Sequence, residues 1–533
     1  MVRLRKLLIL SHRYLGIVLS LLFVVWFASG ITMMYAGGMP RLSGDERLDR
    51  LTAVDLKSIK LTPSQAAEKA GTGGRTTLLT VTGRPAYRFS GRDAVTVFAD
   101  TGDVLEEVDV AQARTVVSRF MNVGDDRVHH EATLTSPDQW TLTQGRQMPQ
   151  HKFVLDDQAG TQVYVSAIIG DVTMVTTRTS RALAWIGTIP HWLYFTALRM
   201  NQPVWYQIVV WTSGVGCILA LLGLILGVTQ YRWSRPRGPE PGPRATGIPY
   251  SGWMRWHYVT GVIFGVFTLT WVFSGWLSME PWGWATQPGL QIPRDAFTGG
   301  AVELARFSLM DPVKWDALMD GRPIKEVEFL RIQDEPYYSV RTGRVLSDAP
   351  RPERLHQPYN VSGRQQGQRI LVAAETLTIR REPFGVDSLV ARLKQAAPQA
   401  PIVESQLLDD YDSYYYSRGR QTPLPILRVK FDDPDKTWVY VDPEVSQVVA
   451  RVHKLDRVER WLYNGLHSLD FSFWYNRRPL WDIGVLILMG GGLASSVLGF
   501  VLGIRRLRRG ATQAVKSWSD APAPAYTSGL PPG

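Results

Sequence analysis

The chain has 533 residues, of which 45% are hydrophobic and 20% are charged, and it contains a single cysteine. This length is enough for several folding units, and the apolar content excludes a disordered chain. One cysteine excludes an intrachain disulfide framework, a four-cysteine iron–sulfur cluster and a Cys-x-x-Cys-His haem attachment site. The net charge of +11 suggests a nucleic-acid partner only if the basic residues form a patch.

Four long runs without Asp, Glu, Lys or Arg predict membrane-spanning helices. They cover residues 14–40, 200–231, 256–279 and 483–504. Each is close to or longer than the roughly 20 residues that a helix needs to cross the hydrocarbon core. Backbone polar groups in lipid must be satisfied within the segment, so the runs are predicted to be helical. The first run is too long for a signal peptide, and three more runs follow it.

The basic residues gather at one end of these predicted helices. The segments before the first helix, between the second and third, and after the fourth hold 14 basic and 2 acidic residues. The rest of the chain holds 45 basic and 46 acidic residues. The positive-inside bias therefore predicts cytoplasmic termini and two long outer segments in a multi-pass protein. Because this charge lies beside the membrane, we expect contact with membrane lipid and no nucleic-acid partner.

The sequence repeats itself in two blocks. A His-x₃-Gly-x₉-Trp-x₂-Ser-Gly pattern around the first helix recurs around the third at an offset of 245 residues, and a second block recurs at an offset of 276. The repeat predicts two units in one orientation, related by a pseudo-twofold axis along the membrane normal. The repeated pairs are His12 and His257, Gly16 and Gly261, Trp26 and Trp271, Ser29 and Ser274, Gly30 and Gly275, Trp185 and Trp461, His191 and His467, Phe195 and Phe471, and Trp205 and Trp481.

The predicted fold class is therefore a membrane α-helical protein with four transmembrane helices, an internal duplication and two α+β extracytoplasmic domains. The expected divisions are helix 1 at 1–40, the first outer domain at 41–180, an interfacial segment and helix 2 at 181–233, a Pro/Gly-rich cytoplasmic linker at 234–250, helix 3 at 251–280, the second outer domain at 281–455, an interfacial segment and helix 4 at 456–510, and a disordered cytoplasmic tail at 511–533.

Within the outer domains, local patterns predict four features. Residues 62–70 have the signature of a capped helix start. Residues 86–99 and 103–110 are predicted to be strands around a turn at Thr101-Gly102. Residues 426–441 are predicted to be a hairpin with a polar turn, and Tyr414-Tyr415-Tyr416 to lie on a strand edge or to contact a substrate.

Four histidines fall at repeated positions beside the predicted membrane helices. The twofold axis pairs His12 with His257 near the cytoplasmic face and His191 with His467 near the outer face. Neutral imidazoles are good axial ligands of haem iron, and the small residues of the repeat leave room for a flat macrocycle. Because the chain lacks an attachment motif, we expect two haems b that are bound non-covalently.

Other roles for these residues remain open. Arg13 and Arg255 flank the inner pair and could meet haem propionates or could only set the topology. An interfacial histidine is often only hydrogen-bonded, and duplication copies it whether or not it binds a ligand. His191 lies 12 residues before Pro203, so it sits either on a short interfacial helix or on an extension of the second span. A metal site at His129-His130-Glu131 is awkward because neighbouring side chains point apart.

These residues resemble the PepSY-associated transmembrane family. The motifs are Ser11-His12-Arg13-Tyr14 with Ser29-Gly30, Tyr164-Val165 with Gly170-Asp171, Arg181, Trp185 and His191-Trp192, and Trp461 with Leu466-His467. The likeness covers residues 1–510, and the outer segments resemble PepSY domains, although the turns at 168–170 and 442–446 depart from the usual pattern. The resemblance implies an iron-regulated bacterial inner-membrane protein. Because some members resemble ferrisiderophore reductases that hold two haems between their helices, it also implies that the four repeated histidines are axial ligands.

The sequence thus favours a b-type dihaem oxidoreductase that passes electrons across the membrane. Its donor would be a quinol or a cytoplasmic reductant, and its acceptor a ferric siderophore or another ferric chelate. The alternative is a non-enzymatic PepSY protein that binds or restrains a peptidase, peptide or sensor partner. A transporter ranks last, because the predicted spans contain no relay of Asp, Glu or Lys.

Overall fold

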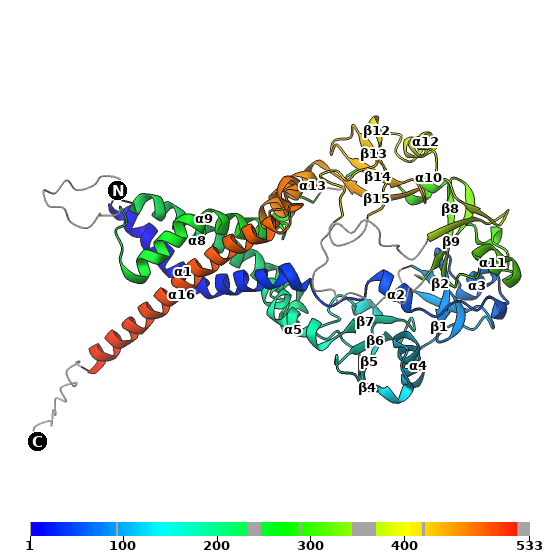
Figure 1. Cartoon of the computed structure of the whole chain (residues 1–533), viewed down its shortest axis with the longest axis horizontal. Helices are drawn as coiled ribbons and strands as arrows, with labels where there is room; N and C mark the ends of the chain where they lie inside the picture. The colour runs from blue at the N-terminus through cyan, green and yellow to red at the C-terminus, as the bar shows by residue number, and fades with distance from the viewer. Residues whose placement is uncertain are drawn as a thin grey trace, which may run out of the picture.

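The computed structural model describes residues 2–91, 94–231, 247–286, 289–343, 369–417 and 422–519. Long helices form a bundle at one end of the molecule, and three sheets form an arch at the other (Figure 1). The long helices are α1 Val2–Ala36, α8 Gln202–Gln230, α9 Gly252–Leu277 and α16 Leu480–Ser519. All four are long and apolar enough to span a membrane, which confirms the predicted helices.

The end of the last helix corrects the sequence analysis. Helix α16 continues to Ser519, so the disorder predicted from residue 511 onward is wrong for residues 511–519. Its extension contains no Gly after Gly510 and no Pro before Ser519, so nothing in it breaks the helical hydrogen bonds. Residues 520–533, and most of the predicted linker at 234–250, lie outside the described part of the chain.

The bundle core consists of aromatic and aliphatic side chains from all four long helices. Phe27 on α1 meets Trp271 on α9 edge to face, with ring centroids 5.8 Å apart. Glycines on α16 permit this close approach, because a Cβ at Gly492 would lie 2.4 Å from the Phe27 ring. The buried members are Leu19, Phe23, Phe27, Leu219, Trp271, Val272, Trp481 and Val485.

The arch contains one seven-stranded and two four-stranded antiparallel sheets. The larger sheet has the order β11-β10-β9-β8-β1-β2-β3. Its strands are β1 Arg75–Val81, β2 Arg84–Ser90, β3 Val95–Phe98, β8 Ile324–Ile332, β9 Glu335–Thr342, β10 Arg369–Ala373 and β11 Thr378–Arg380. The smaller sheets comprise β4 Val128–Leu134, β5 Gln150–Leu155, β6 Gln162–Ser166 and β7 Val172–Thr176, and β12 Ile402–Leu408, β13 Ile426–Phe431, β14 Trp438–Asp442 and β15 Gln447–Val452.

The seven-stranded sheet joins the two halves of the chain. Strand β1 pairs antiparallel with β8, with Leu78 opposite Val327. One hydrophobic core lies against this sheet and takes Tyr87 and Phe89 from the first half and Phe329 and Tyr338 from the second. The long segments 41–180 and 281–455 therefore share a sheet and a core.

Shorter helices connect these sheets with each other and with the bundle. They are α2 Gly44–Arg50, α3 Pro63–Ala70, α4 Val110–Met121, α5 Arg178–Ile186, α6 Thr188–Trp192, α7 Thr196–Arg199, α10 Arg294–Thr298, α11 Pro312–Met319, α12 Val386–Ala396, α13 Lys454–Glu459, the π-helical turn η6 Arg460–Gly465, α14 Leu466–Ser468 and α15 Ser472–Tyr475. The capped helix predicted at 62–70 is confirmed, because Thr62 and Gln65 form a reciprocal capping box before α3.

Two strand predictions are wrong and one is confirmed. Residues 86–99 are not one strand, because β2 ends at Ser90 and β3 begins at Val95. Residues 103–110 form only a bridge from Val104 to Val97. The Val108 N–H instead donates to the Ala167 carbonyl, and Asp109 caps α4, which ends the pairing. The hairpin at 426–441 forms as predicted, with β13 paired to β14.

Candidate functional site

The structure brings the four repeated histidines together in two pairs, each with one ring from each half of the chain. His12 on α1 faces His257 on α9, with ring centroids 6.3 Å apart and planes inclined by 30°. His191 on α6 faces His467 on α14, with centroids 6.2 Å apart and planes inclined by 74°. We call them the inner pair and the outer pair. His191 thus lies on a short helix and not on an extension of α8.

Each ring of the inner pair is fixed by a backbone carbonyl of a neighbouring long helix. The His12 Nδ1 atom lies 3.2 Å from the Leu219 oxygen on α8. The His257 Nδ1 atom lies 3.1 Å from the Ser495 oxygen on α16. A carbonyl only accepts hydrogen bonds, so Nδ1 carries the hydrogen and Nε2 holds the lone pair of the neutral ring.

The outer pair has the same carbonyl contact and adds a serine hydroxyl. The His191 Nδ1 atom lies 3.2 Å from the Trp26 oxygen and 3.0 Å from the Ser29 Oγ atom. The His467 Nδ1 atom lies 3.2 Å from the Trp271 oxygen and 3.0 Å from Ser274 Oγ. The sequence analysis gave these serines only a space-saving role, whereas the structure shows that they orient the rings.

Burial also favours the neutral form of the His191 ring in the outer pair. His191 is surrounded by protein, and this burial lowers its pKa, although the hydrogen bond to the Trp26 carbonyl offsets part of the effect. The ring is therefore neutral at neutral pH, which is the form that binds a metal ion.

A glycine lies against each of the four rings. A Cβ atom would come within 2.9 Å of His12 Cε1 at Gly223, and within 3.2 Å of His257 Cε1 at Gly499. At the repeated Gly30 and Gly275, a Cβ atom would lie 3.4 Å from Cε1 of His191 and His467. Gly223 and Gly499 were not among the predicted residues, although their spacing of 276 residues matches the second block of the repeat.

The paired histidines fit a cofactor whose metal ion is ligated from both faces. Two imidazoles that bind one metal ion from opposite sides, with bonds of about 2 Å, would have ring centroids about 6 Å apart. Both pairs have this separation, and in all four rings Nδ1 is turned toward a carbonyl. The donor set of two neutral imidazoles is the one that a b-type haem uses.

A third histidine pair shows that ring separation alone does not define such a site. His130 and His151 have centroids 6.0 Å apart. Their Nε2 atoms, however, already contact protein oxygens. His130 Nε2 lies 3.1 Å from Thr133 Oγ1, and His151 Nε2 lies 2.8 Å from the Val108 oxygen. The described residues include no group of three His, Cys, Asp or Glu side chains placed to hold a metal ion, at His129-His130-Glu131 or elsewhere.

Arg13 and Arg255 are exposed. Successive residues of a helix point about 100° apart, so Arg13 lies on a different face of α1 from His12. Arg255 precedes His257 by two residues and points to the opposite side of α9. A contact between these arginines and haem propionates stays a prediction.

The tyrosine cluster predicted on a strand edge lies in the loop between β12 and β13 instead, which corrects that prediction. Tyr415 stacks on Tyr440 of β14, with centroids 4.9 Å apart. The Tyr416 hydroxyl lies 3.2 Å from Asp470, just beyond α14. These contacts pull the segment off the sheet edge and link the second four-stranded sheet to the element that carries His467. Arg418 and Arg420, which follow this cluster in the sequence, lie outside the described residues.

The fold and the paired histidines define a multi-pass membrane protein with α+β domains. The family model of the PepSY-associated TM region matches residues 10–305, which is more than half of the chain. The chain therefore belongs to this family, as the sequence motifs indicated. The matched region includes His12, His191 and His257. No curated protein matches the chain.

Proposed function

We propose that this chain is a b-type dihaem oxidoreductase of the bacterial inner membrane. It would take electrons from a quinol or a cytoplasmic reductant and pass them to an extracytoplasmic ferric chelate, such as a ferric siderophore. The observation that carries the proposal is the geometry of the histidines: two pairs with centroids 6.3 and 6.2 Å apart, each ring held through Nδ1. Haem b, when bound at each pair, would supply a one-electron carrier.

The protein fixes its ligand atoms before any cofactor arrives. The Leu219 and Ser495 carbonyls hold the inner rings, and these two residues are 276 positions apart. The Trp26 and Trp271 carbonyls hold the outer rings and are 245 positions apart. Matching contacts at the two sequence offsets support an internal duplication whose pseudo-twofold axis runs between the rings of each pair.

The two pairs lie at opposite ends of the bundle. His12 belongs to the inner pair, and Ser29 on the same helix contacts the outer pair 17 residues later, which corresponds to roughly 25 Å of helix rise. This distance is close to the thickness of the hydrocarbon core. The pairs are thus spaced to carry electrons from one side of the bilayer to the other.

Charge supports the proposed orientation. The exposed arginines at the start of α1 and the end of α16 lie at the end of the bundle that holds the inner pair. Basic residues are retained on the cytoplasmic side, so the inner pair would face the cytoplasm and the arch would lie outside. In this orientation, the outer pair lies between the membrane and the sheets.

The stoichiometry of quinol oxidation and ferric reduction determines which roles the residues of the outer domains must fill. A quinol releases two electrons and two protons on oxidation to quinone, and each Fe³⁺ takes one electron to become Fe²⁺. One quinol therefore reduces two ferric chelates. The acceptor step transfers no atom or proton, so the outer domains need to hold the chelate but need no acid–base residue.

Haem stoichiometry tests this proposal directly. We expect the purified chain, produced with adequate haem, to be red and to bind two haems per chain, as measured by reduced-minus-oxidised absorbance. The variants H12A and H257A should each lose about half of the haem, because each removes one ligand of the inner pair. The matched control H130A should keep both haems, because the His130 nitrogens serve protein hydrogen bonds.

Two results would contradict the proposal. A folded but colourless protein would favour the alternative, a non-enzymatic protein that restrains a peptidase, peptide or sensor partner. Retention of both haems in H12A and in H257A would refute the inner pair as a ligand set.

A further inference from the structure

A cavity of about 660 Å³ lies in the second half of the arch. Its walls come from helix α10, strands β8 and β10, the turn before β15 and strand β15 itself, so it opens between the seven-stranded sheet and the second four-stranded sheet. This volume is within the range of sites that hold small molecules. The residues that the argument uses are Arg294, Arg331, Arg369, Arg451, Gln447 and His453.

The cavity wall is strongly basic. Four arginines and one histidine line it, and none of the described lining residues is Asp or Glu. Arg294 and Arg369 reach the same carboxylate, Glu328, at 3.9 and 3.7 Å, and Arg75 also binds it at 2.7 Å. Glu328 thus contacts three guanidinium groups, and the buried Asp442 also interacts electrostatically with Arg369, so the three guanidinium groups outnumber these two carboxylates.

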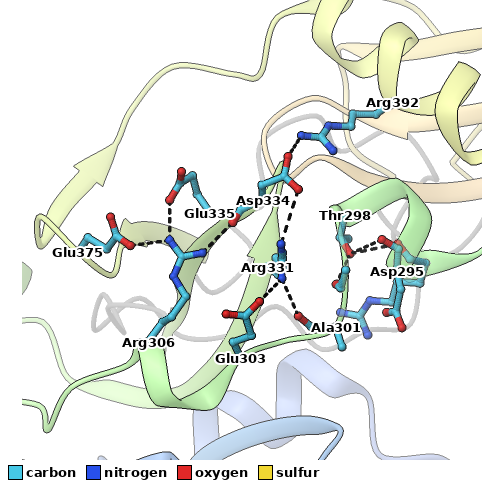
Figure 2. A network of polar contacts seen from close by, with 12 residues as sticks. Asp295, Thr298, Ala301, Glu303, Arg306, Arg331, Asp334, Glu335, Glu375 and Arg392 are labelled. Atoms are coloured by element: carbon cyan, nitrogen blue, oxygen red, sulfur yellow. Dashed lines mark hydrogen bonds and ion pairs between the residues drawn. The ribbon is translucent and has the colours of Figure 1, made fainter.

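The other two arginines of the cavity wall, Arg451 and Arg331, differ in the groups that they contact. Arg451 donates to the neutral amide oxygen of Gln291 at 3.2 Å. Figure 2 shows Arg331 between Glu303 and Asp334, and Asp334 also bound by Arg392. Asp334 is therefore shared between two arginines. The cavity keeps more cationic than anionic groups around it.

In the first half of the chain, a carboxylate neutralises the arginines at the position equivalent to this cavity. Asp171 follows the left-handed Gly170 in the turn from β6 to β7, and its carboxylate binds Arg88 at 2.6 Å and Arg47 at 2.9 Å. The cavity beside this turn measures only about 40 Å³. At the offset of 276 residues, Gln447 at the start of β15 stands in place of Asp171. The second half therefore has no carboxylate at this position, and its cavity is open.

The cavity is also connected to the outer histidine pair by one short stretch of chain. His453 lines the cavity and begins α13, and η6 and α14 follow without a break as far as His467. His467 lies 14 positions after His453, which corresponds to at most roughly 21 Å of helix rise. Gly289 covers the His453 ring with a φ of +55°, and a Cβ atom there would lie 2.0 Å from Cε1, so only glycine fits.

We infer that this cavity binds a multiply anionic ligand of chelate size. Its assignment as the place where a ferric chelate is held for reduction rests on the proposed function. Arginines suit this role because their planar forks bind carboxylate and catecholate oxygens while keeping their charge. The asymmetry between Asp171 and Gln447 means that, in the part of the chain that the structure describes, the second half of the arch provides the site and the first half does not.

Gallium(III) chelates test the binding step apart from electron transfer, because gallium has the charge and size of ferric iron but is not reduced. We expect the full-length protein in detergent to bind anionic gallium citrate or gallium tris-catecholate in calorimetric titrations, more weakly as salt is raised. The variants R451Q, R294Q and Q447E should each raise the Kd about tenfold, because each removes a positive charge or adds a negative one. The matched control R306Q should bind like the unmodified protein, because Arg306 pairs with Glu335 and Glu375 outside the cavity wall (Figure 2).

The outcomes separate this inference from the proposed function. Failure of both anionic chelates to bind, equal Kd values for all variants, or a preference for a cationic gallium trihydroxamate would each overturn the cavity assignment. Haem content is the independent readout. Two bound haems without chelate binding would refute the cavity alone, whereas chelate binding with the predicted variant pattern but no haem would uphold the cavity and refute the proposed function.

Discussion

The serine hydroxyl is the main difference between the inner and outer histidine pairs. All four Nδ1 atoms have a carbonyl partner, but among the described residues only His191 and His467 also contact a serine hydroxyl, that of Ser29 and that of Ser274. Hydrogen bonds to Nδ1–H make the imidazole a stronger electron donor to a bound metal ion. The serines should therefore lower the reduction potential of the outer site relative to an otherwise equal inner site.

We predict that S29A will raise the reduction potential of one haem by tens of mV, at order of magnitude, and leave the other unchanged. The Trp26 carbonyl still holds His191 in this variant, so haem content should stay at two per chain. A spectroscopic redox titration measures both potentials. The control is S20A on the same helix, since Ser20 is buried and its Oγ has no hydrogen-bond partner among the described residues. Equal potentials in S29A and the unmodified protein would show that the serine does not tune this site.

At the scale of elements, the four long helices were the easiest feature to predict. Long uncharged runs have one stable conformation in lipid, so their position follows from composition alone. The strand at 103–110 was mispredicted, because an alternating pattern does not reveal that Val108 donates to Ala167 or that Asp109 caps a helix. Local pattern and tertiary hydrogen bonds compete there, and the tertiary bonds win.

The glycines of α8 and α16 offer a prediction about helix packing. We predict that G223A will weaken haem binding at the inner pair, because its Cβ would lie 2.9 Å from His12 Cε1 and push the ring off the axis. The matched control is G490A on α16, where a Cβ meets nothing within 4 Å. Both changes raise helix propensity equally. Haem titration should give weaker binding in G223A only, and identical haem affinity in the two variants would contradict a positioning role for Gly223.

At the scale of the whole molecule, a buried ion network ties the two halves of the arch together. Arg47 bridges Asp171 of the first half, at 2.9 Å, and Glu326 on β8 of the second half, at 2.6 Å. Burial by itself raises the pKa of Asp171, but Arg88 and Arg47 outweigh it and lower the pKa to about 2. Because the pKa of this carboxyl is lower in the folded chain than in the unfolded chain, ionised Asp171 stabilises the fold.

The lowered pKa of Asp171 predicts how the stability of the arch depends on pH. The contribution of Asp171 is complete above its unfolded pKa of about 3.9 and is lost as the pH falls through its folded pKa of about 2, which amounts to about 3 kcal/mol. D171N should lower the stability of the arch at pH 7 by at least this amount, because it leaves the buried Arg88 without its anion and Arg47 with Glu326 alone. D171N should also flatten the loss of stability between pH 4 and pH 2.

Urea titration followed by near-ultraviolet circular dichroism measures this effect, because Trp315 and several tyrosines are buried in the shared core. The control is D316N, since Asp316 is exposed on α11. Unfolding midpoints that depend on pH in the same way in D171N and the unmodified protein would show that the network does not stabilise the arch.

The sequence alone determined the four spanning helices, the repeat and the identity of the paired histidines. A long apolar span satisfies its own backbone hydrogen bonds in lipid as a helix, and two copies of one motif in the same orientation must face a common axis. Only the tertiary structure revealed the carbonyls that hold Nδ1, the pairing of β1 with β8, and the open cavity beside Gln447. Each of these depends on contacts between residues more than 70 positions apart, and neither periodicity nor composition records which distant groups meet.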